Sequence, residues 1–322
     1  MSVEEGTHTL PDGTELYTKT WKPEGTPRAV LAFVHGFSDH CFLTMLRPGN
    51  AYYEFFPTLA SSGIEVRAFD QRGWGRTFKT PKDRGNSGGT ALVLSDIHSF
   101  LLSLTSQPNS PLFLMGHSMG GGEVLNYVLH PDSPYTKSAT RPQLAGVMSY
   151  SPLIALDPAT RPMALTVILG RLVARILPKW QRHSPLDPKL VCQDETVVAD
   201  YAADELCHDI GTLEQLAGML DRGLWLEKVE VEDLGDRKKI LPMWFGHGDA
   251  DRITSWAATK KLAGVLAVKG EDVTFQSYDG AYHRAHMDPG DIRERFVKDV
   301  SDWVLKRAPV AEAAEAAEAA AE

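Results

Sequence analysis

Cysteine is scarce in this chain, with three residues among 322, Cys41, Cys192 and Cys207. An odd and sparse set argues against a disulfide framework and favours a reducing compartment. The segment from Met1 to Glu5 lacks the positive start and the apolar stretch of a secretory signal. We therefore expect a cytoplasmic protein that is not secreted.

Long apolar runs and an excess of positive charge are also missing. No stretch reaches the roughly 18 consecutive apolar residues that a membrane-spanning helix needs, so we expect at most a peripheral association with membranes or lipid droplets. Lys and Arg number 33 against 42 Asp and Glu, which gives a formal charge of −9. Because phosphate binding draws on clustered Lys and Arg, no nucleic-acid partner is expected.

Metal-binding patterns are absent as well. Eleven histidines occur, but no HxxxH pair on a helix and no CxxC pair is found among them or the cysteines. We therefore expect no metal and no cofactor.

Short apolar runs recur along the chain and are typical of strands that are buried on both faces. They lie at Ala29–Val34, Ile64–Phe69, Leu112–Met115, Leu144–Tyr150, Leu241–Phe245 and Val273–Tyr278. Helical patterns alternate with them at Ala91–Thr105, Gly122–His130, Thr254–Val268 and Asp291–Lys306. This alternation predicts an α/β fold with a mostly parallel central sheet and helices on both faces, after an opening hairpin that turns at Pro11-Asp12-Gly13.

The alternation fails once, between about residues 152 and 240, and this stretch is the candidate for an inserted helical cap. The chain then divides into residues 1–151 (first part of the core), 152–240 (cap or lid), 241–308 (second part of the core) and 309–322 (a low-complexity Ala/Glu tail).

An apolar segment from Met163 to Leu177 predicts a lid helix within the cap. Pro162 fits its first turn and Pro178 fits a stop beyond its end. Arg171 and Arg175 lie four residues apart and therefore on one face of the helix, while nearly all its other residues are apolar. This pattern is typical of a helix that lies in a membrane interface, and the alternative is a helix half buried against the core. The apolar lid residues that we predict are Met163, Leu165, Ile168, Leu169 and Leu172.

The segment Gly116-His117-Ser118-Met119-Gly120 carries the clearest chemical signal. It follows the predicted strand 112–115 directly and opens onto the predicted helix 122–130. A GxSxG segment between a strand and a helix is a nucleophile elbow, in which the serine hydroxyl projects from the top of the sheet. Ser118 is therefore the candidate nucleophile.

A serine hydroxyl needs a histidine to take its proton and a carboxylate to orient that histidine. In this fold class the partners follow in the order Ser, acid, His, from loops after later strands. The loop after strand 241–245 offers Asp249 and Asp251, and the loop after strand 273–278 offers His283 and His286. Spacing alone does not choose within either pair.

An oxyanion hole is expected beside the elbow. The segment His35-Gly36-Phe37 follows the strand 29–34, at the position from which a loop amide joins the amide of the residue after the nucleophile. The backbone N–H groups of Phe37 and Met119 are the predicted donors. His35 and His117 are interpreted as structural histidines that hydrogen-bond loop backbone.

Several segments together resemble the monoacylglycerol lipases of the α/β-hydrolase superfamily, especially the fungal ones. They are His35-Gly36-Phe37, Asp70-Gln71-Arg72-Gly73, Gly116 to Gly121, Ala250-Asp251-Arg252 and Gly280-Ala281-Tyr282-His283. The resemblance implies a serine hydrolase that cleaves monoacylglycerol to glycerol and a fatty acid, with an α/β-hydrolase fold and a lid that contacts a membrane or lipid droplet.

The resemblance also implies roles within each pair. It makes Asp251 the acid and His283 the base, and it places Asp39 and His286 against the glycerol end of the substrate. Mammalian members carry an arginine shortly after the acidic position, whereas here Cys41-Phe42-Leu43 follow it. The rival hypotheses are a carboxylesterase or lysophospholipase of the same fold and a non-catalytic lipid-binding protein of that fold.

Overall fold

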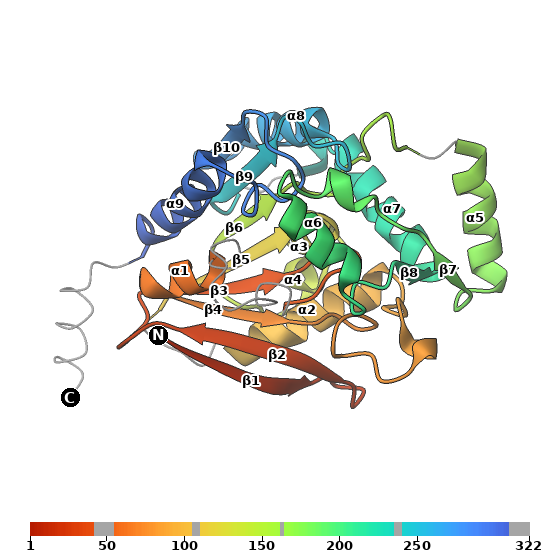
Figure 1. Ribbon diagram of the computed structural model, residues 1–322, viewed down its shortest axis with the longest axis horizontal. Helices are drawn as coiled ribbons and strands as arrows, with labels where there is room; N and C mark the ends of the chain where they lie inside the picture. Colours follow the sequence, from red (N-terminus) through yellow and green to blue (C-terminus); the bar gives the residue numbers. More distant parts are fainter. Residues whose placement is uncertain (42–54, 105–109, 162–163, 235–239, 309–322) are drawn as a thin grey trace.

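An eight-stranded sheet forms the centre of the computed structural model, which describes residues 1–41, 55–104, 110–161, 164–234 and 240–308. Its order is β1-β2-β4-β3-β5-β6-β9-β10 (Figure 1). The bounds are β1 Ser2–Thr9, β2 Glu15–Lys22, β3 Ala29–Val34, β4 Ile64–Phe69, β5 Leu112–His117, β6 Leu144–Tyr150, β9 Met243–Gly248 and β10 Val273–Tyr278. The hairpin β1–β2 is antiparallel and pairs antiparallel with β4, and from β4 to β10 every neighbouring pair is parallel. The predicted mostly parallel sheet is confirmed.

Helices cover both faces of this sheet because its strands are apolar on both faces. In β3, Val30, Ala32 and Val34 belong to one buried cluster and Ala29, Leu31 and Phe33 to the other, as the two-residue period of a strand requires. The first cluster packs under α2 (Thr90–Leu104), α3 (Met119–Leu129) and α8 (Trp256–Ala267). The second packs under α1 (Phe55–Ser61) and α9 (Asp291–Leu305). Short helical turns η3 (Pro81–Asp83) and α4 (Pro134–Lys137) lie in connections.

Between β6 and β9, the residues that the structure describes add no strand to the large sheet. They include α5 (Ala164–Ile176), β7 (Gln181–His183), η4 (Pro188–Leu190), α6 (Glu195–Ala203), β8 (Ile210–Thr212), α7 (Leu213–Lys228) and η5 (Val231–Leu234). β7 and β8 form a separate two-stranded sheet. Side-chain oxygens of Asp194 and Thr212 accept backbone N–H bonds at the starts of α6 and α7, so polar N-caps set where these helices begin.

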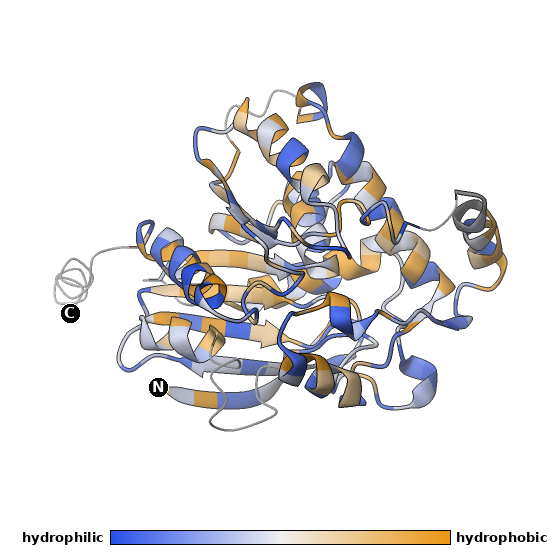
Figure 2. Cartoon of the chain, turned by 45° about the horizontal axis from the view of Figure 1, so that its top comes forward, coloured by the Kyte–Doolittle hydropathy of each residue, from blue (hydrophilic) through white to orange (hydrophobic). Residues whose placement is uncertain are grey.

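Helix α5 matches the predicted lid helix closely and packs against α7 at the edge of the molecule (Figure 1). Large apolar side chains remain exposed along it, and Figure 2 shows hydrophobic residues on its described part. They are Leu169, Leu172, Val173 and Ile176, followed by Leu177 and Trp180. Met163 lies outside the described residues. Within the described ranges, no helix is both long and apolar enough to cross a membrane.

Candidate active site

Ser118 lies at the turn between β5 and α3, where the backbone is held in a rare conformation. Its φ of 53° and ψ of −117° are uncommon for a residue with a side chain. The turn also brings β3 and α3 very close, since a Cβ added at Gly120 would lie 2.3 Å from the carbonyl oxygen of Val34. Only glycine fits there, so the sequence of the elbow follows from its geometry.

Asp251 and His283 meet beside this turn from the loops after β9 and β10. The distance from His283 Nδ1 to Asp251 Oδ2 is 2.7 Å, and both side chains are buried. Because these parallel strands are neighbours, their carboxyl ends present both loops at one edge of the sheet. With its Nδ1–H donated to Asp251, the ring of His283 keeps Nε2 as its proton acceptor.

The carboxylate of Asp251 is surrounded by hydrogen-bond donors. Oδ1 accepts from the backbone N–H groups of Ile253 and Thr254, and Oδ2 accepts from the Thr254 hydroxyl and from His247 Nε2 at 3.1 Å. Burial raises the pKa of Asp251, but the charge of His283 and the hydrogen bonds from His247 and His283 outweigh burial and hold that pKa well below its usual range. The carboxylate is therefore fixed and ionised. Sequence reasoning missed His247 and Thr254, which no local motif marks.

The other member of each predicted pair lies elsewhere. Asp249 is exposed, and its carboxylate accepts the backbone N–H of Gly280 at 2.7 Å, which ties the two loops together. His286 is buried beside the rings of Phe55, Tyr150 and His117. Burial lowers the pKa of His286 well below its usual value. Asp251 and His283 therefore form the hydrogen-bonded pair that the chemistry requires.

Phe37 and Met119, the predicted oxyanion donors, come together from the loop after β3 and the start of α3. Their side chains share one buried cluster with Trp74, whose ring centroid lies 4.9 Å from that of Phe37. A Cβ added at Gly36 would lie 3.1 Å from the Cβ of Ser118, so this loop packs directly against the nucleophile. Their position beside Ser118 is what an oxyanion hole requires; the donor role itself stays a prediction.

Asp39, predicted to contact the alcohol, is paired with a cation that sequence reasoning missed. Its Oδ2 lies 3.0 Å from a guanidinium nitrogen of Arg284 and 3.8 Å from His117 Nδ1. Burial raises the pKa of Asp39, while the charge of Arg284 and the hydrogen bond from His117 overcome that effect and bring it well below its usual range.

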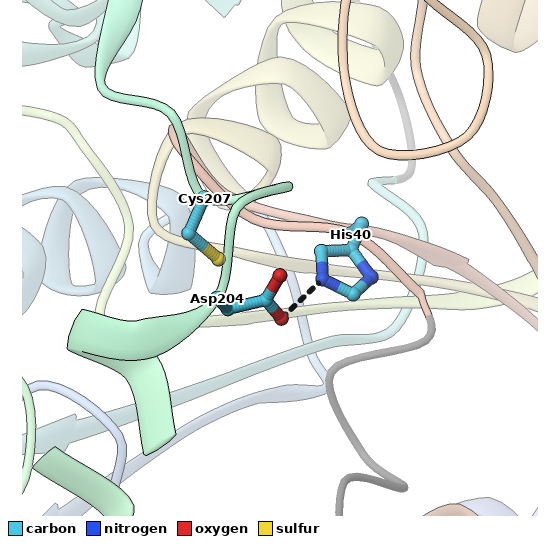
Figure 3. Close-up of side chains that lie close together, drawn as sticks. All are labelled: His40, Asp204 and Cys207. Atoms are coloured by element: carbon cyan, nitrogen blue, oxygen red, sulfur yellow. Dashed lines mark hydrogen bonds and ion pairs between the residues drawn. The ribbon is translucent and has the colours of Figure 1, made fainter. Parts of the chain in front are cut away.

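One group of side chains in the described part of the chain could hold a metal ion, namely His40, Asp204 and Cys207 (Figure 3). Their ligand atoms all lie within 4.8 Å of one another. His40 Nε2 and Asp204 Oδ2 are already hydrogen-bonded at 2.9 Å, and burial raises the pKa of the Cys207 thiol well above its usual value. A metal would have to displace that bond and the thiol proton. The expectation that catalysis needs no metal stays a prediction.

A cavity of about 250 Å³ lies between α5 and α7. Its lining is mostly apolar and includes Leu156, Leu213, Leu216 and Met219. Leu216 and Met219 also pack against the cluster that contains Phe37 and Met119, so the cavity adjoins the two residues that are predicted to form the oxyanion hole. The side chains of the predicted lid residues Leu165 and Ile168 lie outside the described residues.

The fold and the elbow define a class of protein. An eight-stranded, mostly parallel sheet with a strained serine after its central strand β5 and an Asp–His pair at the same sheet edge is an α/β-hydrolase that acts as a serine ester hydrolase. The chain belongs to the family described as serine aminopeptidase, S33 (Hydrolase_4), whose model matches residues 25–290.

Known proteins agree with this class. The chain is 33% identical to a Schizosaccharomyces pombe protein named "Putative monoglyceride lipase" over 92% of this chain and 73% of that protein. It is 26% identical to human monoglyceride lipase over 93% of this chain and 90% of that protein. A solved structure of a soluble variant of Saccharomyces cerevisiae monoglyceride lipase matches with a TM-score of 0.81, 23% identity and 96% coverage of both chains. At that identity the structural match supports the fold alone.

Proposed function

We propose that this protein hydrolyses monoacylglycerol to glycerol and a free fatty acid through an acyl-enzyme on Ser118. The observation that carries the chemistry is the Asp251–His283 hydrogen bond of 2.7 Å at the sheet edge that also presents the strained Ser118. Relatives named monoglyceride lipases support the substrate, since two of them align with more than nine-tenths of this chain.

Each reaction step has a residue of suitable chemistry. His283 Nε2 takes the proton of Ser118 as its oxygen attacks the ester carbonyl, and the resulting oxyanion is stabilised by the N–H groups of Phe37 and Met119. His283 then gives that proton to the departing glycerol oxygen. It next takes a proton from water, which attacks the acyl-enzyme, and Ser118 regains its hydroxyl as the fatty acid leaves. Asp251 holds the charged imidazole throughout.

The acyl chain is best accommodated in the cavity between α5 and α7. The cavity lining is mostly apolar, and two of its residues, Leu216 and Met219, pack against the cluster of Phe37 and Met119. Residues 152–240 form the cap in this proposal, between core segments 1–151 and 241–308. The exposed apolar side chains of α5 are suited to the interface of a membrane or lipid droplet, to which the protein would bind peripherally.

A panel of esters of one fatty acid tests the substrate. We expect the glycerol ester to give a higher kcat/KM than the methyl ester or the lysophospholipid, with no turnover above background in Ser118→Ala. A higher kcat/KM for the methyl ester or the lysophospholipid would show that monoacylglycerol is not the preferred substrate. Failure of a fluorophosphonate to label the wild type at Ser118 would favour a non-catalytic lipid binder.

A further inference from the structure

Helix α5 turns an apolar face away from the protein. Four exposed side chains, which we call the apolar stripe, have the spacing of one helix face, namely Leu169, Leu172, Val173 and Ile176. The other side of α5 meets the protein, since Ala174 is buried and Arg171 pairs with Asp221 of α7. A surface helix normally directs its apolar face toward the core. The apolar stripe of α5 is therefore available to a partner outside the chain.

The exposed apolar surface continues beyond the end of α5. Leu177 and Trp180 lie in the connection to β7, and 62% of Trp180 is exposed. Figure 2 shows hydrophobic residues along the described part of α5. Trp is favoured where lipid meets water, because its ring is apolar and its N–H reaches polar groups. This surface is therefore suited to the boundary of a lipid phase.

Positive charge is concentrated around the apolar stripe. Residues 158–186 contain five of the 33 Lys and Arg and none of the 42 Asp and Glu, so the rest of the chain carries a formal charge of −14. Arg161 and Arg171 pair with Glu227 and Asp221. The other three are exposed and make no ion pair or side-chain hydrogen bond with the residues that the structure describes; they are Arg175, Lys179 and Arg182.

These charges distinguish between the partners that could cover the stripe. A second copy of this chain would place the same cations opposite one another in a two-fold interface, where like charges oppose association. A neutral lipid surface would cover the stripe but offer the three cations no opposite charge. Anionic headgroups offer that charge, and the stems of Lys and Arg can lie along apolar surface while their charged ends reach the headgroups.

We propose that the apolar stripe, Trp180 and the cations of Arg175, Lys179 and Arg182 form one docking surface for phospholipid bilayers with anionic headgroups, and that the cations select such bilayers over neutral ones. This inference rests on the proposed function, in which α5 binds a membrane peripherally, and it identifies the membrane by its charge. The acidic remainder of the chain is repelled by the same bilayer, so the charge distribution also orients the molecule with α5 toward the headgroups.

Vesicle binding in the absence of substrate tests the docking surface. A Lys or Arg beside an anionic leaflet strengthens binding about fivefold, so three of them contribute about 100-fold. In a flotation assay we expect wild type to bind phosphatidylcholine vesicles that contain phosphatidylglycerol about 30- to 100-fold more tightly than phosphatidylcholine alone. At about 1 M salt the preference should fall to about threefold or less, because charges are then screened within about 3 Å.

The variant Arg175→Gln/Lys179→Gln/Arg182→Gln removes the three exposed cations and leaves the apolar stripe unchanged. We expect it to bind both kinds of vesicle about equally, with the affinity that wild type has for phosphatidylcholine. Thermal unfolding checks that the variant folds as wild type does.

The matched control is Arg295→Gln/Lys298→Gln/Lys306→Gln, which removes the same charge from exposed positions on α9 and at its C-terminal end. Helix α9 lies on the opposite side of the molecule from α5 (Figure 1). Because this variant keeps the docking surface, we expect it to prefer phosphatidylglycerol vesicles as strongly as wild type does.

Equal binding of wild type to both kinds of vesicle, or a preference that survives in the α5 variant, would overturn the inference. Self-association of wild type in place of vesicle binding would also overturn it, since a second copy would then cover the stripe. Hydrolysis of monoacylglycerol in detergent micelles is measured separately. Its absence in wild type would refute the proposed function and leave the vesicle result unaffected.

Discussion

Replacing Asp251 by Asn is the sharpest perturbation of the proposed mechanism. The Asn oxygen can keep the bonds from the backbone N–H groups of Ile253 and Thr254, which Oδ1 of Asp251 now accepts. The Asn NH₂ would then face His283, where the carboxylate accepts Nδ1–H at 2.7 Å. Two donors cannot bond each other, so the imidazole proton moves to Nε2, the atom that must take the proton of Ser118. This wrong tautomer should lower kcat about 10⁴-fold, or about 5.5 kcal/mol at 1.36 kcal/mol per factor of ten.

Steady-state hydrolysis of monoacylglycerol measures this loss, and thermal unfolding checks that the variant folds. Asp249→Asn is the matched control, because its carboxylate bonds Gly280 rather than His283. It should retain activity within a few fold. A loss below tenfold in folded Asp251→Asn, or a larger loss in Asp249→Asn, would refute the assignment of the acid.

Three further predictions concern stability and membrane binding. Burial raises the pKa of Glu123 to about 7 despite the opposing charge of Arg222, from an ordinary value of 4.5. Between these two pH values the folded protein therefore holds a proton that the unfolded chain has released. Compared with Glu123→Gln, the wild type should therefore lose free energy of unfolding as the pH rises between these values. Chemical denaturation at several pH values measures this difference, and the opposite slope would contradict the prediction. At pH 8, Arg222→Met should lower the free energy of unfolding by about 3–5 kcal/mol, because it leaves Glu123 buried without its cation. The double variant Glu123→Leu/Arg222→Met should recover most of this stability. Equal losses of stability in the two variants would contradict the pairing. Replacing Leu169, Leu172 and Ile176 by Ser should weaken liposome binding at least about tenfold in a flotation assay while hydrolysis of a soluble short ester is kept, and unchanged binding would exclude α5 as the docking surface.

The sequence predicts the sheet well because buried parallel strands are continuous apolar runs. Four of the runs, including Ala29–Val34, have the bounds of the observed strands. The apolar run Leu241–Phe245 predicts β9 too early, because the pairing of this strand with β10 continues through Gly246 to Gly248, which no apolar run reveals. The sequence does not reveal helix α7, because its buried residues include Gln215 and Arg222, and these interrupt the hydrophobic period.

The candidate site is predictable only where chemistry demands a fixed order in the chain. The elbow and the order Ser, acid, His lead to Ser118, Asp251 and His283, although choosing within each pair took the family resemblance. Hydrogen bonds from His247 and Thr254 to Asp251, and the ion pair of Asp39 with Arg284, depend on how loops fold against one another. No local pattern in the sequence encodes such contacts.

Partitioning of the acyl group between water and a second alcohol tests the central claim most directly. The wild type is given a monoacylglycerol and the p-nitrophenyl ester of the same fatty acid, each in dilute ethanol, and the ratio of ethyl ester to fatty acid is measured. If both substrates pass through one acyl group on Ser118, the two ratios are equal and Ser118→Ala forms neither product. Ratios that differ between the two substrates, or product formation by Ser118→Ala, would contradict the acyl-enzyme.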